Sequence, residues 1–142
     1  MNRQPRRFGQ SGFSLLEVLI TLLITAVGLM GFAAMMLNSA KTNRIAMQRS
    51  VATAYAYDII DCMRANRQAA VAGDYAVDFD ETLSGTTVAV EDVTDWQTAL
   101  SENLPGGKGQ ISFTGNTVTV EVKWTETVNS SQDHTWKTET TL

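Results

Sequence analysis

The 142-residue chain has few of the residues from which catalytic and metal sites are built. Its single cysteine, Cys62, cannot form an intramolecular disulfide or a cysteine-based metal site. Its single histidine, His134, excludes most histidine-based metal and acid–base sites. The sequence also lacks a glycine-rich phosphate loop and a nucleophile elbow. We therefore expect a protein that is not an enzyme and that holds no cofactor and no metal.

Basic residues are scarce as well. Eleven Lys and Arg stand against fifteen Asp and Glu, which gives a formal net charge of −4. A mildly acidic chain is poorly suited to nucleic acid, so we expect no nucleic-acid partner. The length suits a single domain.

The apolar residues are concentrated in one segment rather than spread along the chain. Nineteen of the 25 residues in 13–37 are apolar, and the only charge among them is Glu17. As a helix, 25 residues span roughly 37 Å, which is enough to cross a hydrocarbon core of about 30 Å. Residues 13–37 are therefore predicted to form a transmembrane helix that follows a basic segment, residues 1–12.

The helical pattern continues past this apolar segment. Neither proline nor glycine occurs between residues 38 and 72. An apolar stripe at steps of four is formed by Val51, Tyr55, Ile59 and Met63, which is typical of an amphipathic helix. We predict one continuous helix from Phe13 to about Gln68, with residues 38–68 as its amphipathic half.

Residues 69–142 are predicted to form a β-rich globular head. Residues 69–85 are predicted to form a loop, residues 86–93 a strand, and the following residues a short helix capped by Thr94 and ended by Pro105. Two strands flank the turn signal Gly115-Asn116, and a final edge strand begins at His134. The fold class is thus α+β: a long N-terminal helix packed on a small antiparallel sheet.

The junction between the basic segment and the apolar segment reads GFSLLEV over residues 12–18. A secretory signal peptide has a shorter apolar region, of 7–15 residues. A plain membrane anchor explains neither the Gly-Phe pair nor a carboxylate five residues into the span. The junction closely resembles the signal of type IV prepilins, in which a short basic leader ends in Gly and an acid occupies the fifth mature position. The leader here is residues 1–12, and the matching acid is Glu17.

The resemblance implies the chemistry of this junction. An inner-membrane prepilin peptidase is expected to cleave between Gly12 and Phe13 and to methylate the new amine of Phe13. In lipid, the Glu17 carboxylate costs about 2.5–3.5 kcal/mol if central, and the Phe13 amine of a neighbouring subunit would pair with it and fix the assembly register. The alternative is that Glu17 reaches water at the membrane edge.

Charge alone leaves the membrane topology open, because three basic residues precede the apolar segment and three follow it within twelve residues. The resemblance implies a leader that faces the cytoplasm. The head then lies in the periplasm before assembly and on the pilus surface afterwards.

Later segments resemble PilV-type minor pilins, also called type IV pilus modification proteins. The resemblance is carried by residues 54–67 (AYAYDIIDCMRANR), 96–100 (WQTAL), 104–109 (LPGGKG) and 118–124 (VTVEVKW). Cys62 and Ile60 depart from the residues that this group more often has. The resemblance implies a low-abundance subunit that primes pilus growth at or near the tip, in twitching motility and adhesion. Its partners would be other minor pilins, the major pilin, the prepilin peptidase, the inner-membrane assembly platform and, in some systems, a tip adhesin.

Two other functions stay open: a type II secretion pseudopilin, and an uncleaved, membrane-anchored periplasmic binding protein. Weaker signals favour structural roles. We expect the acidic residues 74–81 to form a solvated loop rather than a calcium site, and Trp96, Trp124 and Trp136 to pack in the core rather than form a carbohydrate surface. Cys62 is expected to be buried, and His134 to be an isolated surface residue.

Overall fold

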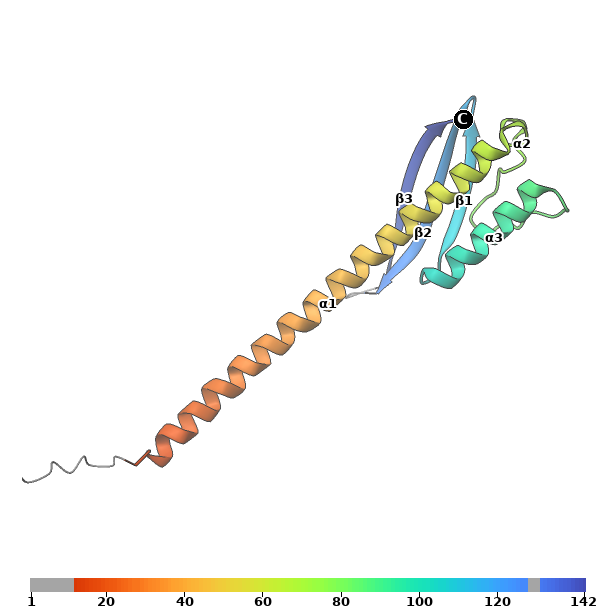
Figure 1. The fold of residues 1–142 in the computed structure, drawn as a ribbon. Coiled ribbons are helices and arrows are strands. Elements are labelled where there is room, and N and C mark those ends of the chain that lie inside the picture. The colour runs from red at the N-terminus through yellow and green to blue at the C-terminus, as the bar shows by residue number, and fades with distance from the viewer. Residues whose placement is uncertain (1–11, 128–130) are drawn as a thin grey trace, which may run out of the picture. The chain divides into compact units, whose positions relative to one another are not determined.

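The structure is a computed structural model that describes residues 12–127 and 131–142. Its elements are α1 (Leu15–Ala65), α2 (Arg67–Ala72), α3 (Val88–Asn103), β1 (Lys108–Thr114), β2 (Thr117–Thr127) and β3 (Ser131–Thr141) (Figure 1). The chain divides into two compact units, Met1–Ala40 and Lys41–Leu142, which we describe separately. A long apolar helix and a small three-stranded antiparallel sheet confirm the predicted α+β class.

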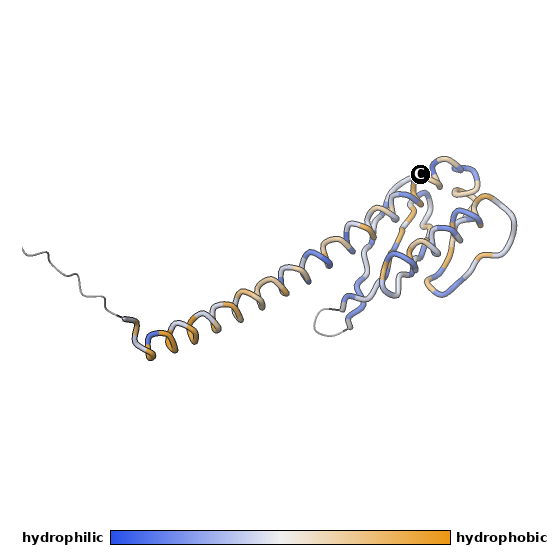
Figure 2. Tube along the Cα trace, turned by 60° about the horizontal axis from the view of Figure 1, so that its bottom comes forward, coloured by the Kyte–Doolittle hydropathy of each residue, from blue (hydrophilic) through white to orange (hydrophobic). Residues whose placement is uncertain are grey.

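In the first unit, α1 begins at Leu15, two residues after the predicted start. Its large apolar side chains are all exposed within the chain, and Figure 2 shows how strongly hydrophobic residues dominate this part of the helix. The hydroxyl groups of Thr21 and Thr25 donate to carbonyl oxygens one turn earlier, at 2.5 and 2.7 Å. The polar groups of these two side chains are thus satisfied within the helix, as a lipid environment requires.

In the second unit, α1 continues to Ala65 and supplies one wall of the hydrophobic core. Its buried residues are Gln48, Ala52, Ala56, Ile59, Ile60 and Met63. The predicted stripe is therefore correct at Ile59 and Met63, whereas Val51 and Tyr55 lie at the margin of the core. The helix is interrupted at Asn66, and α2 then reaches Ala72, so the loop predicted from residue 69 begins four residues later, at Gly73.

The strand predicted over residues 86–93 is wrong, because Val88 begins helix α3. The hydroxyl of Thr87, not of Thr94, caps this helix by accepting a hydrogen bond from the Val90 amide at 3.4 Å. The buried residues of α3 are Ala89, Val93, Trp96 and Leu100. They are spaced by four, three and four positions, which is the period of a helix face. The end of this helix before Pro105 is as predicted.

The three strands form one sheet in the order β1-β2-β3, and both pairs are antiparallel. Gly115, at φ 61°, opens the tight turn between β1 and β2 and confirms the predicted hairpin. Alternate residues of β2, Val118, Val120, Val122 and Trp124, are buried in the core. On β1, Gly109 lies so close to Trp96 of α3 that a Cβ at this position would stand 2.2 Å from the indole ring.

Candidate functional site

The junction predicted to be cleaved lies immediately before α1. Gly12 and Phe13 are exposed and outside the helix, and a Cβ built on Gly12 would meet no atom within 4 Å. The Ser14 hydroxyl accepts a hydrogen bond from the Leu16 amide at 3.3 Å, and the Ser14 carbonyl accepts from the Glu17 and Val18 amides. The peptide bond between Gly12 and Phe13 is thus exposed and lies outside the helix, where a protease can reach it.

Glu17 lies in the first turn of α1. A carboxylate at this end of a helix interacts favourably with the partial positive charge of the free amide groups. Glu17 has no ion pair within the described residues. A cation supplied from outside the described chain, such as a free amine, would therefore meet an unpaired carboxylate here.

The part of α1 that follows this junction carries an exposed apolar surface. Phe13 is 83% exposed, and every large apolar residue from Leu15 to Leu37 is exposed in the isolated chain. Helix α1 is long and apolar enough to cross a membrane, a test that a signal sequence would also pass. Single exposed apolar residues are ordinary, but a contiguous surface of this kind marks a membrane or protein contact.

The second unit holds a buried carboxylate between two elements. Glu126 of β2 is 6% exposed and accepts hydrogen bonds from Arg49 of α1 at 3.1 and 3.4 Å. The Nε2 atom of His134 lies 3.3 Å from Oε2 of the same carboxylate, the oxygen that also accepts from Arg49 Nη2, and the His134 ring stacks on Trp124. His134 is therefore not the isolated surface residue that the sequence predicted. This pairing ties α1 to the sheet.

A second polar cluster lies where α1, α3 and the segment after α2 meet. The hydroxyl of the fully buried Tyr75 donates to the Asp92 carboxylate at 2.5 Å and accepts from the Asn66 amide at 3.2 Å. Burial, followed by the Asp92 contact, raises the pKa of Tyr75 to about 12. Cys62 is free and half-buried rather than buried, and burial raises the pKa of its thiol. A raised pKa makes a thiol less available as the nucleophilic thiolate.

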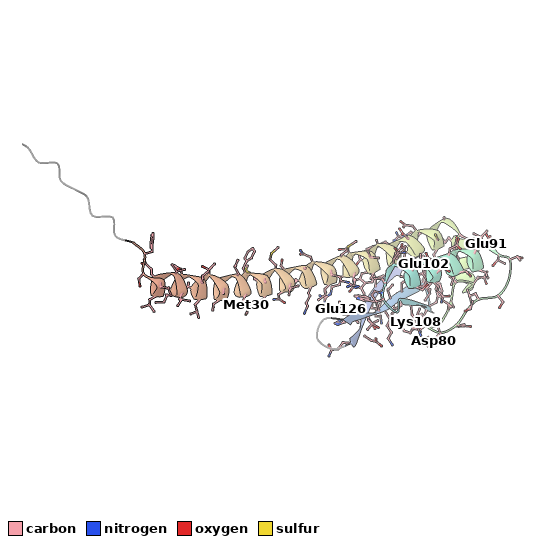
Figure 3. The ribbon with its side chains drawn as sticks, turned by 90° about the horizontal axis from the view of Figure 1, so that it is seen from below. Met30, Asp80, Glu91, Glu102, Lys108 and Glu126 are labelled. Atoms are coloured by element: carbon pink, nitrogen blue, oxygen red, sulfur yellow. The ribbon has the colours of Figure 1, made fainter. Side chains whose placement is uncertain are left out.

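The acidic segment 74–81 forms individual contacts rather than a cage. Asp80 pairs with Lys108, beside which it lies in Figure 3, and this hydrogen bond lowers the pKa of Asp80. The Glu81 carboxylate accepts from the Asp78 amide at 3.1 Å. Among the described residues, no group of three or more His, Cys, Asp or Glu side chains could hold a metal ion.

The tryptophans divide between core and margin. Trp96 and Trp124 are buried, as predicted. Trp136 packs partly against the core and lies edge-on to Tyr57, with 6.2 Å between the ring centroids. Sequence reasoning missed the Glu126 and Tyr75 clusters, because Arg49 lies 77 residues from Glu126 and Asp92 lies 17 residues from Tyr75, and no local pattern joins them.

Comparison with known families adds one finding. The prokaryotic N-terminal methylation motif matches residues 7–33, about a fifth of the chain. No significant match was found among curated proteins or among solved structures. The motif and the long apolar N-terminal helix together indicate a type IV pilin-like or pseudopilin-like protein. They are also consistent with a membrane-anchored chain.

Proposed function

We propose that this chain is a minor pilin of a type IV pilus, with a structural and assembly role rather than an enzymatic one. In this proposal, the prepilin peptidase removes residues 1–12 and methylates Phe13. The mature subunit then joins a minor-pilin complex that primes assembly at or near the pilus tip, for twitching motility and adhesion. Before assembly, the head lies in the periplasm.

One observation carries the proposal: the methylation motif over residues 7–33 runs into helix α1, whose large apolar side chains from Leu15 to Leu37 are all exposed. Cleavage after Gly12 would leave that surface attached to the head. It can then serve first as a membrane anchor and later as the contact surface for neighbouring subunits.

Each residue of the junction has a physical role in this scheme. Gly12 presents no side chain to the peptidase, and Phe13 provides the amine that is methylated. Glu17 is one helical turn further on and is unpaired in the described chain. Its carboxylate would pair with the amine of a neighbouring subunit, and only one axial stagger satisfies both charges.

Mass spectrometry of the mature N-terminus tests the processing step. We expect Phe13, N-methylated, as the first residue in cells with an active prepilin peptidase. Gly12→Leu should leave the leader in place, because the cleavage site then carries a large side chain, whereas Gly9→Leu should be cleaved normally. An intact leader on the unmodified protein would instead favour an uncleaved, membrane-anchored binding protein.

Substitution of Glu17 tests the assembly step. We expect Glu17→Ala to be cleaved normally but to enter filaments poorly, because the register-fixing charge is lost. Thr25→Val, which changes a side chain that bonds only within its own helix, is the matched control. Normal incorporation of Glu17→Ala would contradict the register role.

A type II secretion pseudopilin is the second candidate, because the same motif serves both systems. Deletion followed by complementation separates the two. Loss and rescue of twitching supports the pilus, whereas loss and rescue of exoprotein secretion supports the secretion system.

A further inference from the structure

Strand β3 has a neighbour on one side only. It pairs with β2 over its whole length, and no other described strand or bridge lies along its outer side. At the opposite edge of the sheet, Val77 and Ile111 of β1 exchange two backbone hydrogen bonds, of 3.1 and 2.9 Å. The two edges of the sheet thus differ: among the described residues β1 is bridged at Ile111, whereas β3 has no bridge along its outer side (Figure 1).

The Val77 bridge also shows, through the strand register, which residues of β3 direct their backbone groups toward this open edge. Because Ile111 gives its amide and carbonyl to Val77, its partner on β2, Val120, directs its own groups toward β3. The partner of Val120 on β3 is Thr138, so even-numbered residues of β3 bond to β2. The odd-numbered residues therefore present their backbone groups to the open edge: Asp133, Thr135, Lys137 and Glu139.

An aromatic groove lies directly beside this edge. It has a volume of about 680 Å³ and lies between Arg49 and Tyr57 of α1 and His134 and Trp136 of β3. Tyr57 is 51% exposed. Trp124 also lines the groove, and its buried indole Nε1 has no hydrogen-bond acceptor among the described residues. A strand added to β3 would place alternate side chains on the face that carries this groove.

From these observations we infer that the β3 edge receives an extended segment of another subunit, which adds a fourth, antiparallel strand to the sheet. The segment's main chain bonds to the odd-numbered residues of β3, and its large apolar side chains fill the groove beside Tyr57 and Trp136. The identity of the partner as a filament subunit rests on the proposed function, whereas the strand addition itself rests on the edge and the groove.

The charges on the edge specify the partner further. Asp133, Lys137 and Glu139 all lie on the outward-bonding residues. Within the chain, Lys123 pairs with Asp133 and Lys137 with Glu139, both at 3.0 Å, so charges from an added strand would extend these pairs. Charged residues on an edge strand discourage indiscriminate pairing, and opposite charges directly across an antiparallel pair stabilise it. Read from its own N-terminus, the segment should therefore carry a base opposite Glu139, an acid opposite Lys137 and a base opposite Asp133. Its apolar residues lie opposite His134, Trp136 and Thr138.

A synthetic peptide tests this chemistry on the full chain in detergent micelles. The probe contains Lys-Val-Glu-Phe-Thr-Phe-Lys, and the control peptide has its three charges reversed. At about 1 mM probe, we expect hydrogen exchange at the Thr135 and Lys137 amides to slow by about tenfold or more. The even-numbered amides, already bonded to β2, should change little. Equal slowing by both peptides, or none by the probe, would overturn the inference.

A pair of variants separates strand addition from general loss of structure. Thr135→Pro removes an amide that faces the open edge and leaves the β2–β3 hydrogen bonds in place, whereas Thr135→Ala keeps that amide. We expect the proline variant alone to lose the response to the probe, with both variants unfolding at similar denaturant concentrations. If the proline variant unfolds instead, the comparison of the two peptides on the unmodified chain decides whether the β3 edge accepts a strand.

Amide hydrogen exchange measured in assembled filaments tests whether the partner is a filament subunit. The amide hydrogens of the odd-numbered residues of β3 should exchange slowly in filaments that contain the chain and rapidly in the purified chain. Fast exchange in such filaments would overturn the assignment to a subunit, and slow exchange in a purified dimer would show that a second copy is the occupant. If the chain is absent from filaments, the proposed function fails, while the peptide experiment still decides whether the edge accepts a strand.

Discussion

Tyr75 should make the stability of the second unit depend on pH in the alkaline range. Its side chain is fully buried, and its hydroxyl is held between Asp92 and Asn66. Ionisation would place a negative charge in a buried site, beside the Asp92 carboxylate. Burial and Asp92 accordingly raise the pKa of Tyr75 from 10.0 to about 12.

The sign and size of the effect follow from proton linkage. The folded state holds the phenolic proton more tightly than the unfolded state does, so stability falls as pH rises. The contribution is complete below about pH 10 and is lost as pH approaches 12. Each pKa unit corresponds to about 1.4 kcal/mol, so the total loss in the free energy of unfolding is on the order of 2–3 kcal/mol.

Tyr75→Phe isolates this contribution from that of other groups that titrate in the same range. Near neutral pH we expect it to be less stable than the unmodified protein by about 1–3 kcal/mol, because Asp92 and Asn66 lose a buried partner. The two stability curves should then converge between about pH 10 and pH 12. Guanidinium unfolding of the full chain in detergent, followed by fluorescence of the buried Trp96 and Trp124, measures both curves.

Tyr57→Phe is the matched control, because Tyr57 is 51% exposed. Its curve should run parallel to that of the unmodified protein throughout. If the Tyr75→Phe curve also runs parallel, the hydroxyl of Tyr75 does not gain its proton affinity from the folded structure, and the reasoning fails.

Two further predictions concern local structure in the second unit. Thr87→Ala should lower the free energy of unfolding by about 1 kcal/mol, because α3 loses its cap, whereas Thr94→Ala should show no capping loss; chemical denaturation compares them. Gly109→Ala should destabilise by about 1–3 kcal/mol or more, because the added methyl group collides with Trp96. Gly28→Ala, whose methyl group meets no atom within 4 Å, is its control in the same unfolding assay.

The strand wrongly predicted over residues 86–93 shows how a strand pattern and a helix pattern can compete in one segment. Residues 86–93 alternate in polarity and contain β-branched valines, which favours a strand. The same residues also begin a helical period, because Ala89 and Val93 align with Trp96 and Leu100. A window of eight residues is too short to distinguish the strand period from the helix period, whereas the sixteen residues of α3 show the helix period clearly. Packing of this longer face against β1 and α1, rather than local propensity, determines the outcome.

The elements that were predicted correctly depend on short-range chemistry. The hairpin follows from a glycine that can adopt φ 61° at the turn, and the β2 core face follows from strict alternation. By contrast, the contacts of Glu126 with Arg49 and of Tyr75 with Asp92 follow only from the packing of α1 against the sheet and against α3. Each polar partner alone looks like an ordinary surface residue in the sequence, so no local signal could have joined them.

The junction at Gly12 and the proposed site at the β3 edge differ in the same way, because the first is local in the sequence and the second depends on long-range contacts. The junction at Gly12 is a contiguous segment that a peptidase would read along the chain, so a motif spanning residues 7–33 suffices to find it. The proposed site at the β3 edge depends on the fold, because Val77 bridges β1 and not β3, and because Trp136 lies beside Tyr57. A change that leaves the β3 sequence intact but removes the Val77 bridge would open a second edge and weaken the distinction between the two. The proposed cleavage signal is therefore a local feature of the sequence, whereas the proposed strand-accepting surface depends on the order of strands in the folded sheet.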